Sequence, residues 1–126
     1  MFSKNKQQPL EISQQEISAI IGEGYVLTGE LRGSSVVRIE GKIIGNVNVE
    51  GGVILGETGI VEGDIITKSA ILYGTVNGNI KTTHLEIKKS GNVSGDINTD
   101  TLEIEIGAKY NGRLNMYKQP MLAEAS

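Results

Sequence analysis

The chain has 126 residues, no cysteine and a formal net charge of −3. Its length fits one domain, the absence of cysteine excludes disulfides and thiolate chemistry, and the negative charge argues against a nucleic-acid partner. The sequence holds no apolar run near the roughly 18 residues that span a bilayer, and we expect no secretory signal. A cysteine-free chain of this kind fits a reducing cytoplasm.

The first six residues, MFSKNK, combine two large apolar side chains with positive charge. Two interpretations of Met1, Phe2, Ser3, Lys4 and Lys6 stay open from the residues alone. The stretch is either a tail without a role or a weak membrane anchor. In the second case Met1 and Phe2 bury at the headgroup boundary, and the lysines attract anionic lipids.

Residues 10–21 also allow two structures. The sequence SQQE at 13–16 matches a helix capping box, and Ile17, Ile20 and Ile21 follow at helical spacing. This pattern predicts a short capping helix. The alternative is that these isoleucines belong to the first turn of the repeat described next.

A five-residue unit of the form V-x-G-[DN]-[IV] recurs through the middle of the chain, as in VEGDI at 61–65 and VSGDI at 93–97. Its glycines are separated by 16, 18, 15, 17 and 17 residues, and they are Gly29, Gly45, Gly63, Gly78, Gly95 and Gly112. A second apolar pair lies halfway through each interval, in the segments VRIE (37–40), VILG (53–56), AILYG (70–74), LEIK (85–88) and LEIEIG (102–107). Alternation of apolar and polar residues in these segments predicts strands with one buried face.

The period fits a coil with three sides. Seventeen extended residues span about 56 Å at roughly 3.3 Å each, which gives sides of a little under ~20 Å. Glycine permits the sharp corners, and successive coils would stack about 4.8 Å apart in parallel register. We therefore predict an all-β, single-domain β-solenoid over residues 17–116, with tails at 1–16 and 117–126. The residues expected to stack inside it are Val61, Ile65, Val76, Ile80, Leu85, Ile87, Val93, Ile97, Leu102, Ile104 and Ile106.

An all-β sandwich is the alternative fold, but it does not require a 17-residue recurrence. An enzyme alternative is a left-handed β-helix acyltransferase, whose hexapeptide repeat gives 18-residue coils. The uneven steps here break strict hexads, and the single histidine, His84, is expected to point outward. The sequence has no P-loop motif for nucleotide and no calcium-binding repeat. We predict no enzymatic activity, no cofactor and no metal.

A solenoid has two ends at which backbone groups and apolar side chains lack a neighbour. Neither end of this one has a convincing polar cap. We therefore predict that the chain binds copies of itself end to end. The candidate contacts at the N-terminal end are Ile17, Ile20, Ile21, Tyr25, Leu27 and Leu31. Those at the C-terminal end are Leu102, Ile104, Tyr110, Leu114, Met116 and Tyr117.

The opening MFSKNK, the segment ISAIIGEGYVLTGELRGSSVVRIEGKIIGNV and the repeated V-x-G-[DN]-[IV] units together resemble the bactofilins, which are bacterial polymer-forming cytoskeletal proteins. The resemblance implies a right-handed parallel β-helix of about six triangular coils with short flexible tails. It also implies assembly into filaments by end-to-end stacking, without nucleotide. Family members often carry phenylalanine near the C-terminal end of the rod, where this chain has Tyr110 and Tyr117 with Leu114 and Met116.

The resemblance also bears on location and partners. It implies that the stretch at 1–6 targets the inner face of the membrane, so that the protein is cytoplasmic and peripherally membrane-associated. The filament would act as a scaffold for cell-wall or polar proteins, in cell shape, cell-wall organisation or motility. Which of these cargo proteins is recruited, and the polarity of the filament, stay open.

Overall fold

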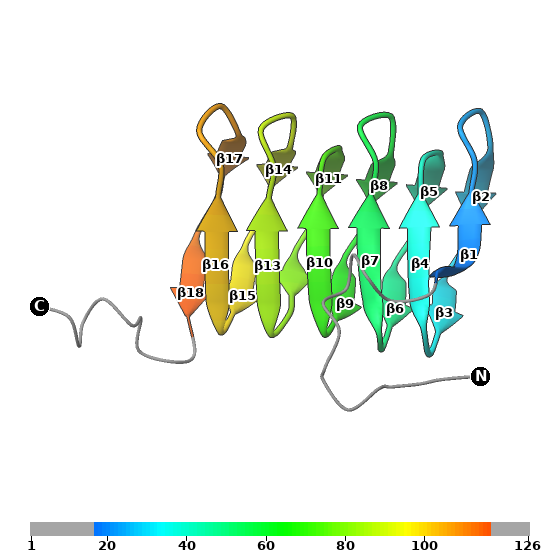
Figure 1. Cartoon of the computed structure of the whole chain (residues 1–126), viewed down its shortest axis with the longest axis horizontal. Coiled ribbons are helices and arrows are strands. Elements are labelled where there is room, and N and C mark those ends of the chain that lie inside the picture. The colour runs from blue at the N-terminus through cyan, green and yellow to red at the C-terminus, as the bar shows by residue number, and fades with distance from the viewer. Residues whose placement is uncertain (1–16, 117–126) are drawn as a thin grey trace, which may run out of the picture.

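The computed structural model describes residues 17–116, which form eighteen strands arranged in three parallel sheets. Each sheet takes one strand from each of six successive coils, so the described part of the chain is a rod of six three-sided coils (Figure 1). This confirms the predicted β-solenoid. The short strands and their parallel register follow from the glycine-punctuated, β-branched repeat.

The first sheet contains β1 (Ile17–Ile21), β4 (Val36–Ile39), β7 (Gly52–Leu55), β10 (Ser69–Leu72), β13 (His84–Ile87) and β16 (Thr101–Ile104). The second contains β2 (Val26–Thr28), β5 (Lys42–Ile44), β8 (Ile60–Glu62), β11 (Thr75–Asn77), β14 (Asn92–Ser94) and β17 (Lys109–Asn111). The third contains β3 (Leu31–Gly33), β6 (Val47–Val49), β9 (Ile65–Thr67), β12 (Ile80–Lys81), β15 (Ile97–Thr99) and β18 (Leu114–Met116).

The core of the rod consists of apolar columns that run from coil to coil. In the second sheet the register aligns Leu27, Ile43, Val61, Val76, Val93 and Tyr110. In the third it aligns Leu31, Val47, Ile65, Ile80, Ile97 and Leu114. Members of both columns in the four middle coils are fully buried. The two apolar positions of the repeated unit therefore fill two columns, as predicted.

Two expectations differ from the structure, one about the secondary structure of residues 17–21 and one about the burial of Ile106. Residues 17–21 are the strand β1 and not part of a helix, because they pair in parallel with β4 in the first sheet. The capping-helix interpretation is therefore wrong for these residues, whereas 10–16 lie outside the described residues. Ile106 is 96% exposed, because β16 ends at Ile104 and Ile106 follows in a turn.

The repeat glycines form the tightest column in the rod. Their φ angles lie between 125° and 156°, a region that residues with a Cβ rarely adopt. A Cβ added to Gly78 would lie 2.0 Å from the carbonyl oxygen of Gly63 in the coil before it. Glycine is therefore required at this corner by both its φ angle and the approach of the neighbouring backbone.

The residue after each of these glycines connects neighbouring coils. The backbone N–H of Asp64 donates to Oδ1 of Asn46 at 3.0 Å, that of Asn79 to Asp64 at 2.9 Å, and that of Asp96 to Asn79 at 3.0 Å. Amide and carboxylate side chains alternate along this column, which keeps carboxylates out of adjacent coils. The repeat alone does not predict these contacts between coils.

A second polar contact lies inside the rod. Thr82 and Thr99 are buried, and the Thr82 hydroxyl donates to the Thr99 hydroxyl at 2.9 Å. The Thr99 hydroxyl in turn donates to the carbonyl oxygen of Thr101 at 2.9 Å. Since both hydroxyls are hydrogen-bonded, they fit the interior without an unsatisfied donor.

We predict that Gly78→Ala lowers the free energy of unfolding by about 3 kcal/mol or more, because it combines backbone strain with a clash. Gly24→Ala is the control for strain alone, since Gly24 has a φ of 92° and open space around its Cβ position. Gly33→Ala is the control for neither effect, because its Cβ position is open and its φ is not positive. Denaturant unfolding of the three variants measures the difference; equal losses at Gly78 and Gly24 would contradict the clash.

Candidate functional site: the two ends of the rod

The rod ends in strands that are paired on one side only. At the N-terminal end these are β1, β2 and β3, and at the C-terminal end β16, β17 and β18. The free edge of a strand presents unpaired N–H and C=O groups to any strand that can approach it. Every described strand belongs to one of the three sheets, so no strand within residues 17–116 covers either end.

The N-terminal end carries both column residues and a rim. Ile21, Leu27 and Leu31 are half-buried and pack against the core, because each begins an inward column. Ile20 and Tyr25 lie at the rim and are 65% and 71% exposed. Val26, which was not predicted as a contact, also lies at this end. A shallow hollow of about 430 Å³ is lined there by Ile20, Ile21, Gly22, Tyr25, Val26 and Leu27.

Ile17 lies away from this end surface. It pairs with Val36 and packs with it on the outer face of the first sheet. The prediction that Ile17 is an end contact is therefore not met, because residue spacing does not reveal the strand register that turns it outward.

The C-terminal end exposes side chains that are buried one coil earlier. Ile104 and Leu114 are 45% and 41% exposed, whereas Ile87 and Ile97, which precede them in the same columns, are fully buried. Leu102, Tyr110 and Met116 are half-buried at the same end. The higher exposed fraction in the last coil arises because no further coil packs on it. The predicted residues of this end, except Tyr117, therefore lie together on one surface.

Tyr110 occupies the column that valines fill in the preceding coils. Its ring packs against the core, and its hydroxyl donates a hydrogen bond to the carbonyl oxygen of Arg113. Burial, with a smaller contribution from the charge of Asp96, raises the pKa of the Tyr110 hydroxyl. The hydroxyl is therefore neutral at physiological pH and adds no charge to the end surface.

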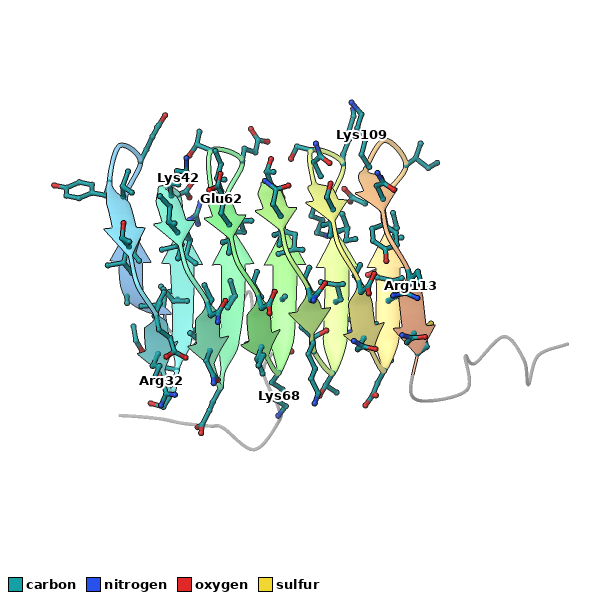
Figure 2. The ribbon with its side chains drawn as sticks, turned by 180° about the vertical axis from the view of Figure 1, so that it is seen from behind. Arg32, Lys42, Glu62, Lys68, Lys109 and Arg113 are labelled. Atoms are coloured by element: carbon teal, nitrogen blue, oxygen red, sulfur yellow. The ribbon has the colours of Figure 1, made fainter. Side chains whose placement is uncertain are left out.

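Charged side chains at both ends are paired at the rim. Figure 2 shows Arg32 on the first coil and Arg113 on the last. Arg32 Nε lies 3.2 Å from Glu30 Oε2, and Arg113 Nη2 lies 3.3 Å from Asp96 Oδ2. Exposed pairs of this kind add little stability. Their importance here is that charge lies at the rim of each end while the apolar columns occupy its centre.

His84, the residue on which an acyltransferase would depend, points outward from β13. Its Nε2 lies 3.1 Å from Glu86 Oε2, and its Nδ1 contacts the Thr101 hydroxyl. Burial opposes ionisation of Glu86, but hydrogen bonds from Lys88 and His84 outweigh it and lower the pKa of that carboxyl. His84 is thus held in a surface network. Within residues 17–116 no group of three or more potential ligands could hold a metal ion.

Part of the predicted site lies outside the described residues. These positions are the candidate membrane stretch, Met1, Phe2, Ser3, Lys4 and Lys6, together with Tyr117 of the candidate C-terminal contact. In the part of the chain that the structure describes, no helix is long and apolar enough to cross a membrane.

The chain is similar in sequence to two curated bactofilins. The chain is 29% identical over 108 residues to the bactofilin BacP of Myxococcus xanthus (strain DK1622), covering 85% of this chain and 45% of BacP. It is 32% identical over 63 residues to BacO of the same organism, covering half of each chain. The chain thus spans about half the length of the curated relatives it matches.

Solved structures agree with these relatives. The rod resembles a cryo-EM reconstruction of Thermus thermophilus bactofilin double helical filaments, with a TM-score of 0.75 and 28% identity over 77% of this chain and 97% of that chain. It also resembles the solid-state NMR structure of the bactofilin BacA, with a TM-score of 0.73 and 28% identity over 80% of this chain and 98% of that chain. The family model described as "Bactofilin: Polymer-forming cytoskeletal" matches residues 19–115. Since that match includes nearly all of the rod, the chain belongs to the bactofilin family of polymer-forming cytoskeletal proteins.

Proposed function

We propose that this chain forms filaments by end-to-end stacking of its rods, without nucleotide, and that the filaments lie on the inner face of the cytoplasmic membrane as a scaffold. The observation that carries the proposal is the exposure of the end columns. Ile104 and Leu114 are about half-exposed at positions where the coil before them buries the same columns completely. Stacking a second rod on this end restores the missing layer.

The physical gain from stacking has two sources. Burying the end columns removes apolar surface from water, at about 25 cal/mol per Å². Pairing the free edges of β16, β17 and β18 supplies hydrogen bonds to groups that are otherwise solvated. The central position of the apolar columns and the paired charges at the rim suit such a contact.

Nucleotide independence is supported by the kind of site that the chain lacks. The full sequence has no P-loop motif, and its only Gly-Lys pair, at 41–42, is followed by isoleucine instead of serine or threonine. Lys42 Nζ is instead 3.6 Å from Glu62 Oε2 on the next coil. We therefore expect assembly to be driven by burial of the end columns and pairing of the free strand edges, with no cofactor and no catalysis.

Membrane association is proposed from the first six residues. Each lysine near an anionic membrane surface contributes on the order of 1 kcal/mol, and Phe2 adds a shallow apolar contact. One such stretch binds weakly. A filament carries many of them, so later contacts are made at high effective concentration. The protein would then be cytoplasmic and peripheral, recruiting cell-wall or polar proteins in support of cell shape, cell-wall organisation or motility.

We predict that Leu114→Arg abolishes long filaments, because stacking would bury an unpaired charge at the centre of the end surface. Negative-stain electron microscopy and sedimentation measure the outcome. Ile66→Arg is the matched control: Ile66 is, like Leu114, an exposed apolar residue on the third sheet, but it points outward from a middle coil. Filaments that persist in Leu114→Arg would show that the interface is elsewhere.

The same variant distinguishes the two filament polarities that remain open. In a head-to-tail filament every contact includes a C-terminal end, so Leu114→Arg should leave monomers. In a filament of alternating contacts the N-terminal ends still meet, so the variant should leave dimers. Leu31→Arg tests the other end, and light scattering measures the mass of each species.

We predict that deleting residues 2–6 releases the protein from vesicles containing phosphatidylglycerol but leaves filaments unchanged. Flotation of the vesicles measures binding, and phosphatidylcholine vesicles control for the charge of the lipid. Phe2→Ser and the pair Lys4→Gln with Lys6→Gln separate the apolar and electrostatic contributions. Loss of filaments together with loss of binding would refute the separation of the two roles.

A further inference from the structure

The outer face of the first sheet changes character along the rod. One outward column begins with Ile17, Val36 and Gly52. The other runs through Ile20, Arg38, Ile54, Ile71, Glu86 and Glu103. The face is therefore largely apolar over the first four coils and acidic over the last two. Apolar side chains on one face of a sheet are normally buried against another element.

The apolar part of this face is buried although it points away from the core. Val36, Ile54 and Ile71 are only 2%, 8% and 6% exposed, and they form a second hydrophobic cluster with Ile17. The other two sheets provide an internal comparison. Two outward isoleucines on them, Ile44 and Ile66, are 39% and 48% exposed, and a third, Ile60, is half-buried. Outward placement alone therefore does not bury an isoleucine on this rod.

Three members of this cluster, Ile17, Ile54 and Ile71, line a groove of about 490 Å³. The groove is lined by residues that include Ile17, Arg38, Glu40, Ile54, Ile71 and Tyr73. All strands between residues 17 and 116 are already used in the three sheets, so none of them is available to fill it. A strand that fills this groove would therefore come from outside this range.

We propose that the occupant is the segment 10–16 of the same chain, docked across β4, β7 and β10. This segment joins the rod at Ile17, which is itself a member of the outward cluster. The C-terminal segment instead leaves from Met116, on the third sheet and at the opposite end of the rod (Figure 1). Position along the chain therefore favours the N-terminal segment.

Length and composition fit this occupant. Three strand spacings separate β1 from β10, about 14 Å at roughly 4.8 Å each, and the seven residue steps from Leu10 to Ile17 reach up to about 23 Å. The segment reads LEISQQE, so Leu10 and Ile12 alternate with polar residues and point the same way when extended. These two apolar side chains on one face of the segment fit the apolar part of the groove formed by Ile17, Ile54 and Ile71.

Docking on the side of the rod also resolves a conflict between the N-terminal tail and stacking. The tail begins at the first coil, where it could cover the end surface around Leu27 and Leu31. Held along the first sheet, it leaves that end open to another rod. It also directs the residues proposed to bind the membrane, 1–6, toward one side of the filament.

The absence of cysteine from the chain allows a direct test. We would introduce Ile12→Cys together with Ile71→Cys into the full-length protein and oxidise it at low protein concentration. The matched control pairs Ile12→Cys with Ile66→Cys, an outward position on the third sheet. We expect a disulfide within one chain, with at least a ten-fold higher yield for the first pair than for the control. Mass spectrometry of the digested protein identifies the linked peptides.

Two results would overturn the proposal. A disulfide between chains would assign the groove to a second copy, and equal yields for both pairs, also with Leu10→Cys in place of Ile12→Cys, would show that the segment is not held there. Hydrogen exchange of the unaltered protein gives a second test that does not depend on the exact pairing. Amides of residues 10–16 should exchange at least ten-fold more slowly in the unaltered chain than in Ile71→Glu, and exchange at the rate of an unstructured peptide in both would also refute docking.

Discussion

The stacking of one coil on the next is the interaction on which the rest of this structure depends. A single three-sided coil has too little interior to bury its own apolar side chains, so each coil is stable only against its neighbours. Inward columns such as Val61, Val76 and Val93 provide apolar contact at every step. The hydrogen bonds from each coil to the side chain of Asn46, Asp64 or Asn79 add a directional contact at the corner.

The same dependence leaves the two ends of the rod with apolar side chains that are incompletely covered. The first and last coils each have one neighbour, and their columns are exposed to the extent that the second neighbour is absent, as Ile104 and Leu114 illustrate. In the proposed stacking, the interface between rods repeats the interior of the rod, so no separate binding module is needed to polymerise. The sides of the rod are then available for other contacts, and among the sheets of residues 17–116 only the first has an apolar outer face with such low exposure, around Ile54 and Ile71.

The solenoid fold and its inward columns could be predicted from the sequence, because each coil needs the same residue types at the same positions. The requirement for glycine at the corner, as at Gly78, and for an apolar inward residue, as at Ile80, recurs in every coil, and the period of this recurrence can be read from the sequence. What failed depends on register or on neighbours outside the repeat. Ile17 alternates with its neighbours like an inward residue, yet its pairing with Val36 places it outside. The hydrogen bond between Thr82 and Thr99 joins residues 17 positions apart, and neither belongs to the five-residue unit.

The central claim is that filaments extend by adding coils along the axis of the rod. Fibre diffraction of aligned filaments, assembled in buffer free of nucleotide and metal, tests it most directly. Strands would then lie across the filament axis, and the account predicts a reflection near ~4.8 Å along that axis. The same reflection at right angles to the axis would mean that rods associate through their sides and would contradict the account. Failure to assemble without nucleotide would contradict it as well.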